Sequence, residues 1–338
     1  MPDPTDAALL VALQRGLPLV ERPFAAVGDA LGHAEAEVLQ RIEAWLRDGT
    51  ARRVGGIFRS HALGYASLLC AVDADADRLD GLAAIVNRHP GVTHNYAREG
   101  RPALWFTLLA PASRLEAEAD GLEQALGCAV IRLPATLRFK TRVILDPAAG
   151  RAAADSPARS VSDRQLACPG RPEAGPVLPL GDTDRNIIRR LQEPLPLVPA
   201  PFAAVAEAAG CGEADLLERL RRWADAGVLS RVALVPHHRR LGFGGNAMCV
   251  WDPNPDVLPA AGAALAARPE VTHCYARRRD PRFPFSLYAM IHGRTAADAH
   301  AGFAALSTLV PAGPGRCLLS TREYKKTSPR YFVGDEAG

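Results

Sequence analysis

Residues 92–98 read Val-Thr-His-Asn-Tyr-Ala-Arg, and residues 271–277 read Val-Thr-His-Cys-Tyr-Ala-Arg. β-branched and aromatic residues favour a strand, and residues two apart in a strand point to the same face. We therefore expect His94, Tyr96 and Arg98 to project together from one strand. The equivalent set in the second stretch is His273, Tyr275 and Arg277.

The duplication extends outward from these two stretches over most of the chain. A shift of 178 positions places Leu17 on Leu195 and Trp45 on Trp223, and a shift of 185 places Lys140 on Lys325. Two copies in register predict two similar units that pack about a pseudo-twofold axis, as a dimer within one chain.

Each copy is predicted to begin with a winged helix-turn-helix unit. In the first copy, residues 23–31 and 34–47 have the apolar spacing of helices, and residues 53–58 read as a strand. Gly32 and Gly49 follow the two helices, where glycine commonly ends a helix.

The rest of each copy reads as a ferredoxin-like βαββαβ sandwich. In the first copy the expected strands are 67–72, 92–96, 104–109 and 130–139, and the expected helices are 79–89 and 114–126. The second copy repeats this order from Asn246 to about Lys326. The fold class is therefore α+β, built as a tandem duplication.

The predicted domains follow from these elements. The helix-turn-helix domains are 1–64 and 181–242, and the ferredoxin-like domains are 65–146 and 243–338. Residues 147–180 are rich in Pro, Ala, Gly and Ser without an apolar period, which predicts a flexible linker.

Composition narrows the class of protein. The net charge is +3, and the chain has no apolar run near the roughly 18–20 residues of a membrane span. The seven cysteines are scattered without a CxxC pair, which favours a reducing cytoplasm and argues against a structural metal site. The first residues lack a signal-peptide pattern. We expect a cytoplasmic protein without a membrane partner.

A helix-turn-helix joined to a ferredoxin-like domain resembles the leucine-responsive (Lrp/AsnC) regulators. That family reads DNA with its first domain and senses a small molecule with its second. The candidate reading helices are acidic, however. Residues 33–48 hold four acids and two arginines, and residues 211–226 hold four acids and three arginines. Because DNA affinity depends on neutralising phosphates, no nucleic-acid partner is expected, and the regulator is kept as the rival hypothesis.

An imidazole, a phenol and a guanidinium on one strand face could hold an anion and transfer a proton. A single His-x-Tyr pair is more often structural, although its repetition favours function. More basic residues lie on the final strands, at Arg138, Lys140 and Arg142 in the first copy and at Arg322, Lys325, Lys326 and Arg330 in the second. Residues 181–338 carry 20 Lys and Arg against 16 Asp and Glu, so this half is the better candidate to hold a polyanion.

Three segments resemble the siroheme decarboxylases: residues 92–96 with 104–108, residues 271–294, and the tail that reads REYKKTSPRYF. The first half is similar to one subunit type and the second half to its partner type. The fused arrangement fits haem d1 biosynthesis in denitrifying bacteria. The resemblance implies a lyase that converts siroheme to 12,18-didecarboxysiroheme, in which two acetate side chains become methyl groups and two CO2 are released.

The chemistry of that substrate suggests roles for particular residues. We expect His94 or His273 to donate a proton, with Tyr96 or Tyr275 as its partner; a histidine that ligates the substrate iron is the alternative. The residues expected to bind substrate are Arg98, Arg138, Lys140, Arg277, Arg278, Arg322, Lys325 and, as part of an apolar floor, Trp105. No further cofactor is expected, because the chain shows no P-loop, dinucleotide turn or metal-ligand spacing.

The two copies are not expected to be equal, because Cys274 replaces Asn95 and Glu323 aligns with Arg138. One copy is degenerate, or each copy prefers one acetate. The expected partners are siroheme and its product, and further decarboxylase subunits or haem d1 biosynthesis proteins are candidates. A tetrapyrrole carrier without chemistry is the second alternative to the enzyme.

Overall fold

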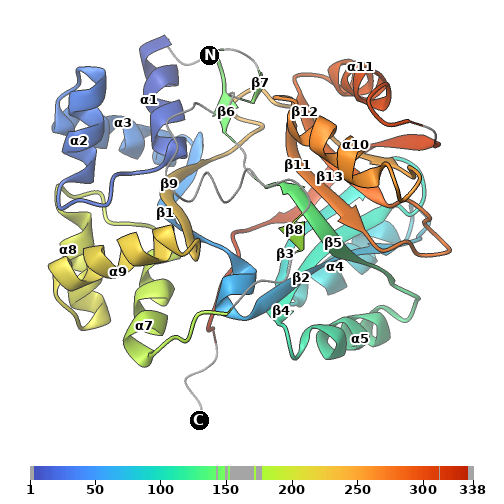
Figure 1. The fold of residues 1–338 in the computed structure, drawn as a ribbon, viewed down its shortest axis with the longest axis horizontal. Helices are drawn as coiled ribbons and strands as arrows, with labels where there is room; N and C mark the ends of the chain where they lie inside the picture. Colours follow the sequence, from blue (N-terminus) through green and yellow to red (C-terminus); the bar gives the residue numbers. More distant parts are fainter. Residues whose placement is uncertain are drawn as a thin grey trace.

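The computed structural model describes residues 4–141, 144–148, 151–152, 171–172, 177–311 and 313–333. Figure 1 shows two lobes. One lobe contains the helix-turn-helix units of both copies, and the other contains a β-barrel with helices on its outside. Each lobe therefore combines the corresponding halves of both copies.

The helical lobe contains three helices and a strand from each copy. They are α1 (Pro4–Arg15), α2 (Pro23–Leu31), α3 (Glu35–Arg47) and β1 (Ala51–Phe58), followed in the second copy by α7 (Asp182–Leu191), α8 (Pro201–Ala209), α9 (Glu213–Asp225) and β9 (Leu229–Pro236). The predicted helices 23–31 and 34–47 are confirmed, and Gly32 and Gly49 have positive φ after them. The first helix of each copy, α1 or α7, was not predicted.

The strand predicted as a wing pairs across the two copies, since β1 and β9 form an antiparallel ribbon. Reciprocal main-chain bonds extend it: Arg59 donates to Val228 over 2.9 Å, and His237 donates to Thr50 over 2.8 Å. The two donors, Arg59 and His237, are 178 positions apart, and so are the two acceptors, Thr50 and Val228. The expected pseudo-twofold axis therefore passes through this ribbon. A single apolar core joins both copies here, with Trp45 and Trp223 among its buried residues.

The second lobe contains both βαββαβ units. The first consists of β2 (Tyr65–Val72), α4 (Leu79–Arg88), β3 (Val92–Arg98), β4 (Leu104–Pro111), α5 (Leu115–Leu126) and β5 (Ile131–Lys140). The second consists of β10 (Gly245–Trp251), α10 (Leu258–Ala266), β11 (Val271–Arg277), β12 (Leu287–Gly293), α11 (Ala296–Ser307) and β13 (Gly315–Lys326). A 3-10 turn, η1 (Ser60–Leu63), precedes β2. The predicted element order is confirmed.

The two sheets close into one antiparallel barrel, which the sequence did not predict. The last strand of each copy pairs with the third strand of the other copy: β13 with β3, and β5 with β11. The order β5-β11-β12-β10-β13-β3-β4-β2 therefore returns to β5. Closure removes the open edges that two separate sheets would expose.

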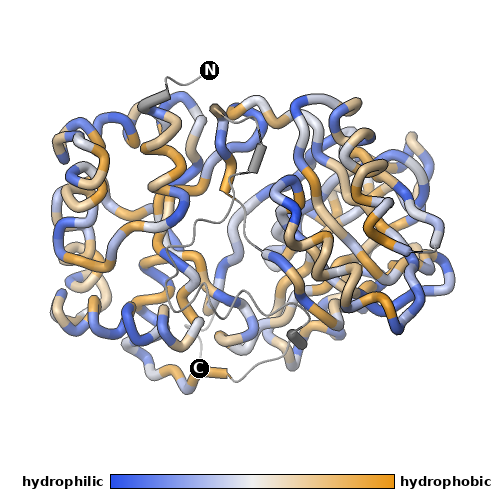
Figure 2. The backbone as a smooth tube through the Cα atoms, turned by 45° about the horizontal axis from the view of Figure 1, so that its top comes forward, coloured by the Kyte–Doolittle hydropathy of each residue, from blue (hydrophilic) through white to orange (hydrophobic). Residues whose placement is uncertain are grey.

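The strands have an outer and an inner face. Outer residues such as Phe106 and Leu287 pack with the helices of their own copy. Inner residues from both copies, including Trp105, Met248 and Tyr288, form a core without helical residues. Figure 2 shows hydrophobic stretches along the strands and helices, and more hydrophilic connections between them.

Short strands lie just before the predicted linker, residues 147–180, and within it. β6 (Leu145–Asp146) pairs with β7 (Arg151–Ala152), and β8 (Arg171–Pro172) pairs with β5. The main chain of Leu178 donates to Ala62 over 3.0 Å. Most of residues 147–180 lie outside the described residues, so the predicted flexibility of this segment stays a prediction.

Candidate active site

The repeated strand β3 directs its three polar side chains into the barrel. The His94 and Tyr96 rings stack with centroids 6.3 Å apart, and the Arg98 guanidinium lies 5.3 Å from the Tyr96 centroid. The neighbour Asn95 points outward instead and donates to Ala83 O over 3.1 Å. The alternation of a strand thus produces the shared face that the sequence predicted.

The second copy builds the equivalent arrangement on β11. The Arg277 guanidinium lies 5.0 Å from the centroid of Tyr275 and 5.6 Å from that of Tyr288. Arg277 donates to Leu133 O over 2.7 Å, and Arg98 donates to Leu318 O over 3.2 Å.

Arg98 and Arg277 therefore brace the barrel, because each binds the last strand of the opposite copy. The Nε atom of each is buried without a partner among the described residues. Part of each guanidinium thus has hydrogen-bonding capacity left for a ligand.

The two tyrosines face different charges. Tyr96 lies opposite Glu323 in the barrel and donates to its carboxylate over 3.2 Å. Tyr275 lies opposite Arg138. Among the described residues, the Arg138 guanidinium has no hydrogen bond or ion pair. The two faces are therefore electrostatically unequal, as the alignment of Glu323 with Arg138 predicted.

His94 and His273 lie at the same end of the barrel, since β3 and β11 both begin there. Burial first, and then the charges of Lys326 and His273, together lower the pKa of His94 to about 3. The pKa of His273 is lowered to about 4, first by burial and then by Lys326. Both imidazoles are therefore neutral near pH 7. The sequence interpretation assigned a separate site to each copy. In the structure, the two histidines instead lie at the same end of one barrel.

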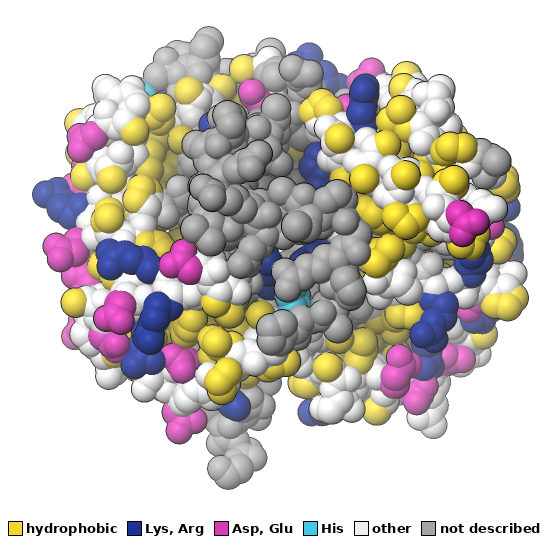
Figure 3. All heavy atoms as spheres, viewed as in Figure 1, with side chains coloured by type: hydrophobic (Ala, Val, Ile, Leu, Met, Phe, Trp, Pro, Cys, Tyr) yellow, Lys and Arg dark blue, Asp and Glu magenta, His cyan; other side chains and the backbone are white. Residues whose placement is uncertain are grey.

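Sequence reasoning missed a polar cluster beside His94. Lys326 Nζ lies 2.7 Å from Nδ1 of His238, and the rings of His238 and His292 are 5.6 Å apart. Arg52 of β1 donates to Lys326 O over 3.0 Å. No pattern in the sequence links these positions, because only the closed barrel and the β1–β9 ribbon bring them together. Figure 3 shows histidine and basic side chains at the surface near the centre of the view, where the two lobes meet.

Three residues predicted to bind substrate point outward instead. Lys325 donates to Asn87 O over 2.9 Å and Lys140 donates to Arg268 O over 2.9 Å. Cations at these positions satisfy carbonyls at the ends of α4 and α10. Arg322 forms an ion pair of 2.7 Å with Asp80. These contacts favour structural roles for the three residues, and their expected binding of substrate stays a prediction.

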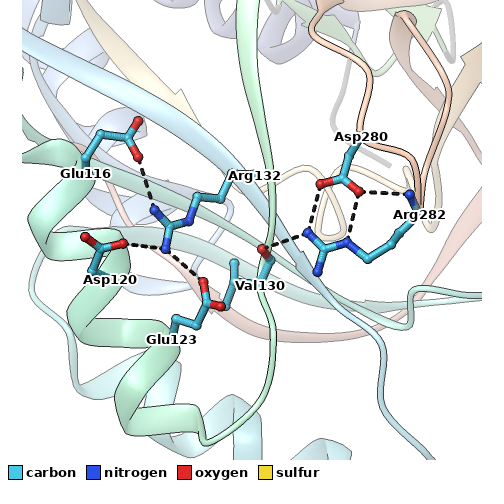
Figure 4. Close-up of polar contacts among 7 residues, drawn as sticks. All are labelled: Glu116, Asp120, Glu123, Val130, Arg132, Asp280 and Arg282. Atoms are coloured by element: carbon cyan, nitrogen blue, oxygen red, sulfur yellow. Dashed lines mark hydrogen bonds and ion pairs between the residues drawn. The ribbon is translucent and has the colours of Figure 1, made fainter.

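The basic hairpin after β11 lies at the opposite end of the barrel from the histidines. Arg278 is exposed there. Arg282 pairs with Asp280 over 2.8 Å and donates to Val130 O, which ties the hairpin to the start of β5 (Figure 4). The predicted role of Arg278 in substrate binding is therefore not supported by its position.

Trp105 lies inside the barrel and is 1% exposed. Its Nε1 donates to Pro102 O over 2.7 Å, and its ring lies 5.1 Å from that of Phe283. It belongs to the apolar interior, at a distance from solvent. Arg142, noted with the basic residues of the first copy, lies outside the described residues.

The described part of the chain has neither a membrane-spanning helix nor a cluster of metal-binding side chains. No helix there is long and apolar enough to cross a bilayer. No group of three or more His, Cys, Asp or Glu side chains there has an arrangement suited to hold a metal ion.

Family models match both domain types in both copies. Residues 6–52 and 184–229 match the siroheme decarboxylase NirDL-like HTH domain. Residues 62–140 and 240–325 match the AsnC-like ligand binding domain. Together these matches cover most of the chain and follow the two lobes of the structure.

Relatives agree with the family models. The chain is 38% identical to the siroheme decarboxylase NirDL subunit of Paracoccus denitrificans, over 96% of both chains. It is 46% identical over 143 residues to the siroheme decarboxylase alpha subunit of Desulfovibrio desulfuricans, a match that covers 42% of this chain and 82% of the relative.

Solved structures give the same result. Crystal structures of the siroheme decarboxylase NirDL, one in co-complex with an iron-uroporphyrin III analogue, match with a TM-score of 0.70 and 28% identity. The match covers 97% of this chain and 94% of theirs. This chain belongs to the siroheme decarboxylase family.

Proposed function

We propose that the chain converts siroheme to 12,18-didecarboxysiroheme, with the release of two CO2, in haem d1 biosynthesis. One observation of the structure carries the proposal: His94 and His273, from the two copies, lie at one end of a single barrel, beside basic groups such as Lys326 that form no ion pair among the described residues. The membership of the chain in the family supplies the substrate class.

The site suits a flat polycarboxylate. Siroheme carries eight carboxylates, and an arginine can bind a carboxylate through two parallel hydrogen bonds. Arg138 has no partner among the described residues, and Arg98 and Arg277 each retain an unpartnered Nε. We propose these three as ligands of substrate carboxylates.

The chemical step needs one proton for each CO2. When the bond between the acetate methylene and its carboxylate breaks, CO2 leaves and the electron pair passes to the methylene carbon and the conjugated ring. A proton then adds to that carbon and completes a methyl group. We propose that His94 and His273 supply these protons and regain them from water.

A neutral imidazole is a poor acid, so the substrate itself must favour the protonated form. Burial and the positive charge of Lys326 lower the pKa of both histidines in the free protein. Carboxylates that enter the site counter that charge and raise the pKa of the histidines. Proton donation is therefore linked to the presence of substrate.

Iron ligation by a histidine is the second role considered for the same residues. A neutral imidazole is the form that binds iron, and both histidines are neutral in the free protein near pH 7. A single His→Ala variant would shift the absorption spectrum of bound siroheme if that histidine ligates iron. A proton donor would instead change turnover while the spectrum stays the same.

The charge distribution weighs against the DNA-binding alternative. In α3, Arg41 forms an ion pair with Asp6 of α1. In α9, Arg219 pairs with Asp184 of α7 over 2.8 Å. Arginines that neutralise acids of their own domain are not free to meet phosphates. The helix-turn-helix units instead join the two copies through the β1–β9 ribbon.

The finer parts of the function are also proposals. We propose that the substrate iron is the only metal required, that the two halves form the functional pair within one chain, and that the protein works in the cytoplasm. Further decarboxylase subunits or haem d1 biosynthesis proteins remain candidate partners.

The test is anaerobic incubation of the purified chain with siroheme, followed by mass analysis of the extracted tetrapyrrole. Two decarboxylations of siroheme should lower its mass by two CO2, about 88 mass units. An unchanged mass with a shifted spectrum would indicate a carrier without chemistry. An unchanged spectrum, together with salt-dependent binding to duplex DNA, would favour the regulator.

A further inference from the structure

We propose that Lys326, His238 and His292, beside Asn246, form a carboxylate-binding subsite on one side of the active site only, and that this subsite fixes the orientation of siroheme between His94 and His273. The inference rests on the proposed function and names the residues that determine which acetates react.

The first step of the argument concerns Lys326. Its ammonium lies inside the barrel end, directly opposite His94 in the strand register, and its one hydrogen bond in the described part of the chain is to Nδ1 of His238. It forms no ion pair there. A partly buried cation without a counter-ion is costly, so an anionic ligand at this place would be stabilised.

The neighbouring acid Glu323 does not provide a counter-ion for Lys326. Glu323 accepts from Tyr96 and lies 3.9 Å from Arg52. Burial first, and then the positive charges of Arg52 and Arg239, lower the pKa of Lys326 to about 8. The lysine remains mostly protonated at pH 7, and its surroundings favour an added negative charge.

Unpartnered polar atoms lie next to this ammonium. Because Lys326 donates to Nδ1 of His238, the proton of the neutral ring is on Nε2, which is buried with no partner in the described structure. Nδ1 of His292 and Oδ1 of Asn246 are also buried without partners there. Asn246 and His292 lie opposite each other on β10 and β12.

Unsatisfied buried groups are rare in folded proteins, and several together indicate a missing ligand. His238 and Asn246 are 3% and 5% exposed, so these groups are fixed parts of the interior. A carboxylate would accept from Lys326 and from Nε2 of His238. A proton on Nδ1 of His292 would provide a third donor.

The first copy has no such group of side chains. The register of the duplication places Ser60 on His238, Ser67 on Asn246 and Thr141 on Lys326. Ser67 lies opposite Leu109, which therefore corresponds to His292. The hydroxyl of Ser60 already bonds to Tyr331 over 2.9 Å. The subsite is thus one-sided, although the barrel around it is pseudo-symmetric.

A one-sided anchor has a chemical consequence. An ammonium stabilises the carboxylate that it binds more than the transition state, in which the negative charge moves into the ring. The anchored carboxylate is therefore not one that loses CO2. Instead, it holds the macrocycle in one orientation, with the acetates to be removed near His94 and His273.

The experiment compares Lys326→Met with Lys325→Met, its neighbour on the outer face of β13. Binding of siroheme is measured by absorption titration, and the position of each lost CO2 is determined by NMR of the extracted product. We expect Lys326→Met to weaken binding about tenfold or more, from the loss of one charge-assisted contact, and to give a mixture of regioisomers. Lys325→Met should retain both affinity and product, and Lys326→Arg should recover the single product.

Wild-type affinity and a single wild-type product in Lys326→Met would overturn the proposal. If Lys326→Met does not fold, as judged by circular dichroism, His238→Ser replaces it with the residue of the first copy and carries the same expectation. If the wild-type chain binds siroheme but releases no CO2, the proposed function fails. The subsite is then tested by the affinity for siroheme alone. Equal affinities of Lys326→Met and the wild type would rule out the subsite.

Discussion

The phenol of Tyr96 donates a 3.2 Å hydrogen bond to the carboxylate of Glu323, although the two residues are 227 positions apart in the chain. They meet because the last strand of the second copy completes the sheet of the first. By the same exchange, Arg138 of the first copy lies opposite Tyr275 of the second. Each face of the interior therefore contains residues of both copies.

The first prediction concerns this pair. Tyr96→Phe removes the donor and Glu323→Ala removes the acceptor of this largely buried hydrogen bond, so the free energy of unfolding should show a coupling of about 1–2 kcal/mol in a double-mutant cycle. Urea unfolding of the wild type, both single variants and the double variant measures it. If the effects of the two single substitutions on the free energy of unfolding add to that of the double substitution within about 0.5 kcal/mol, the hydrogen bond does not stabilise the contact between the two copies.

The second prediction compares two basic residues of β5. Arg138 has no partner among the described residues, whereas Lys140 binds Arg268 O over 2.9 Å. Arg138→Gln should therefore weaken siroheme binding by roughly tenfold or more, the cost of one or two charge-assisted hydrogen bonds. Lys140→Gln should leave affinity unchanged and lower the stability of the fold slightly. The reverse ranking in an absorption titration would assign substrate binding to Lys140 instead.

Much of the fold could be predicted from the sequence, because local patterns determine its elements. The apolar spacing of 23–31 and the glycine after it define α2, and the alternation around Tyr96 defines β3. Even the unequal charges of the two faces followed from aligning Glu323 with Arg138. These features depend on short-range periodicity and on the register of the repeat.

Closure of the barrel could not be predicted, because it depends on which edges of two sheets meet. That exchange brings Lys326 next to His94 and turns Lys325 outward to the carbonyls of α4. The sequence interpretation placed both lysines in one basic group, but it named only Lys325 as a substrate ligand. His292 carried no signal at all, since its neighbours His238 and Asn246 come from other segments of the chain.

The third prediction separates structural arginines from those of the site. Arg132 points outward from β5 and pairs with Glu116, Asp120 and Glu123 around α5 (Figure 4). Arg132→Met leaves three carboxylates without their shared cation, so we expect stability to fall by roughly 1 kcal/mol. Siroheme turnover at a temperature where the variant stays folded should equal that of the wild type. A loss of turnover without unfolding would mean that α5 communicates with the site.

The fourth prediction concerns pH. The pKa values of four histidines are lowered, mainly by burial: to about 3 in His94 and His292, to about 4 in His273 and to about 2 in His238. In the unfolded chain they titrate near 6.5. Between these values the unfolded state binds more protons, so acid favours unfolding. The stability contributed by neutral histidines is complete above pH 6.5 and declines as pH falls below it.

Each such histidine should reduce the free energy of unfolding by about 1.4 kcal/mol per pH unit once the pH is well below 6.5. Urea unfolding of the ligand-free chain between pH 7 and 5.5 measures the slope. His238→Gln should reduce the slope by up to one proton, and replacement of the exposed His300 by Gln serves as the control that leaves it unchanged. An identical slope in His238→Gln and wild type would mean that His238 is protonated inside the fold. It could not then accept the hydrogen bond from Lys326 through Nδ1.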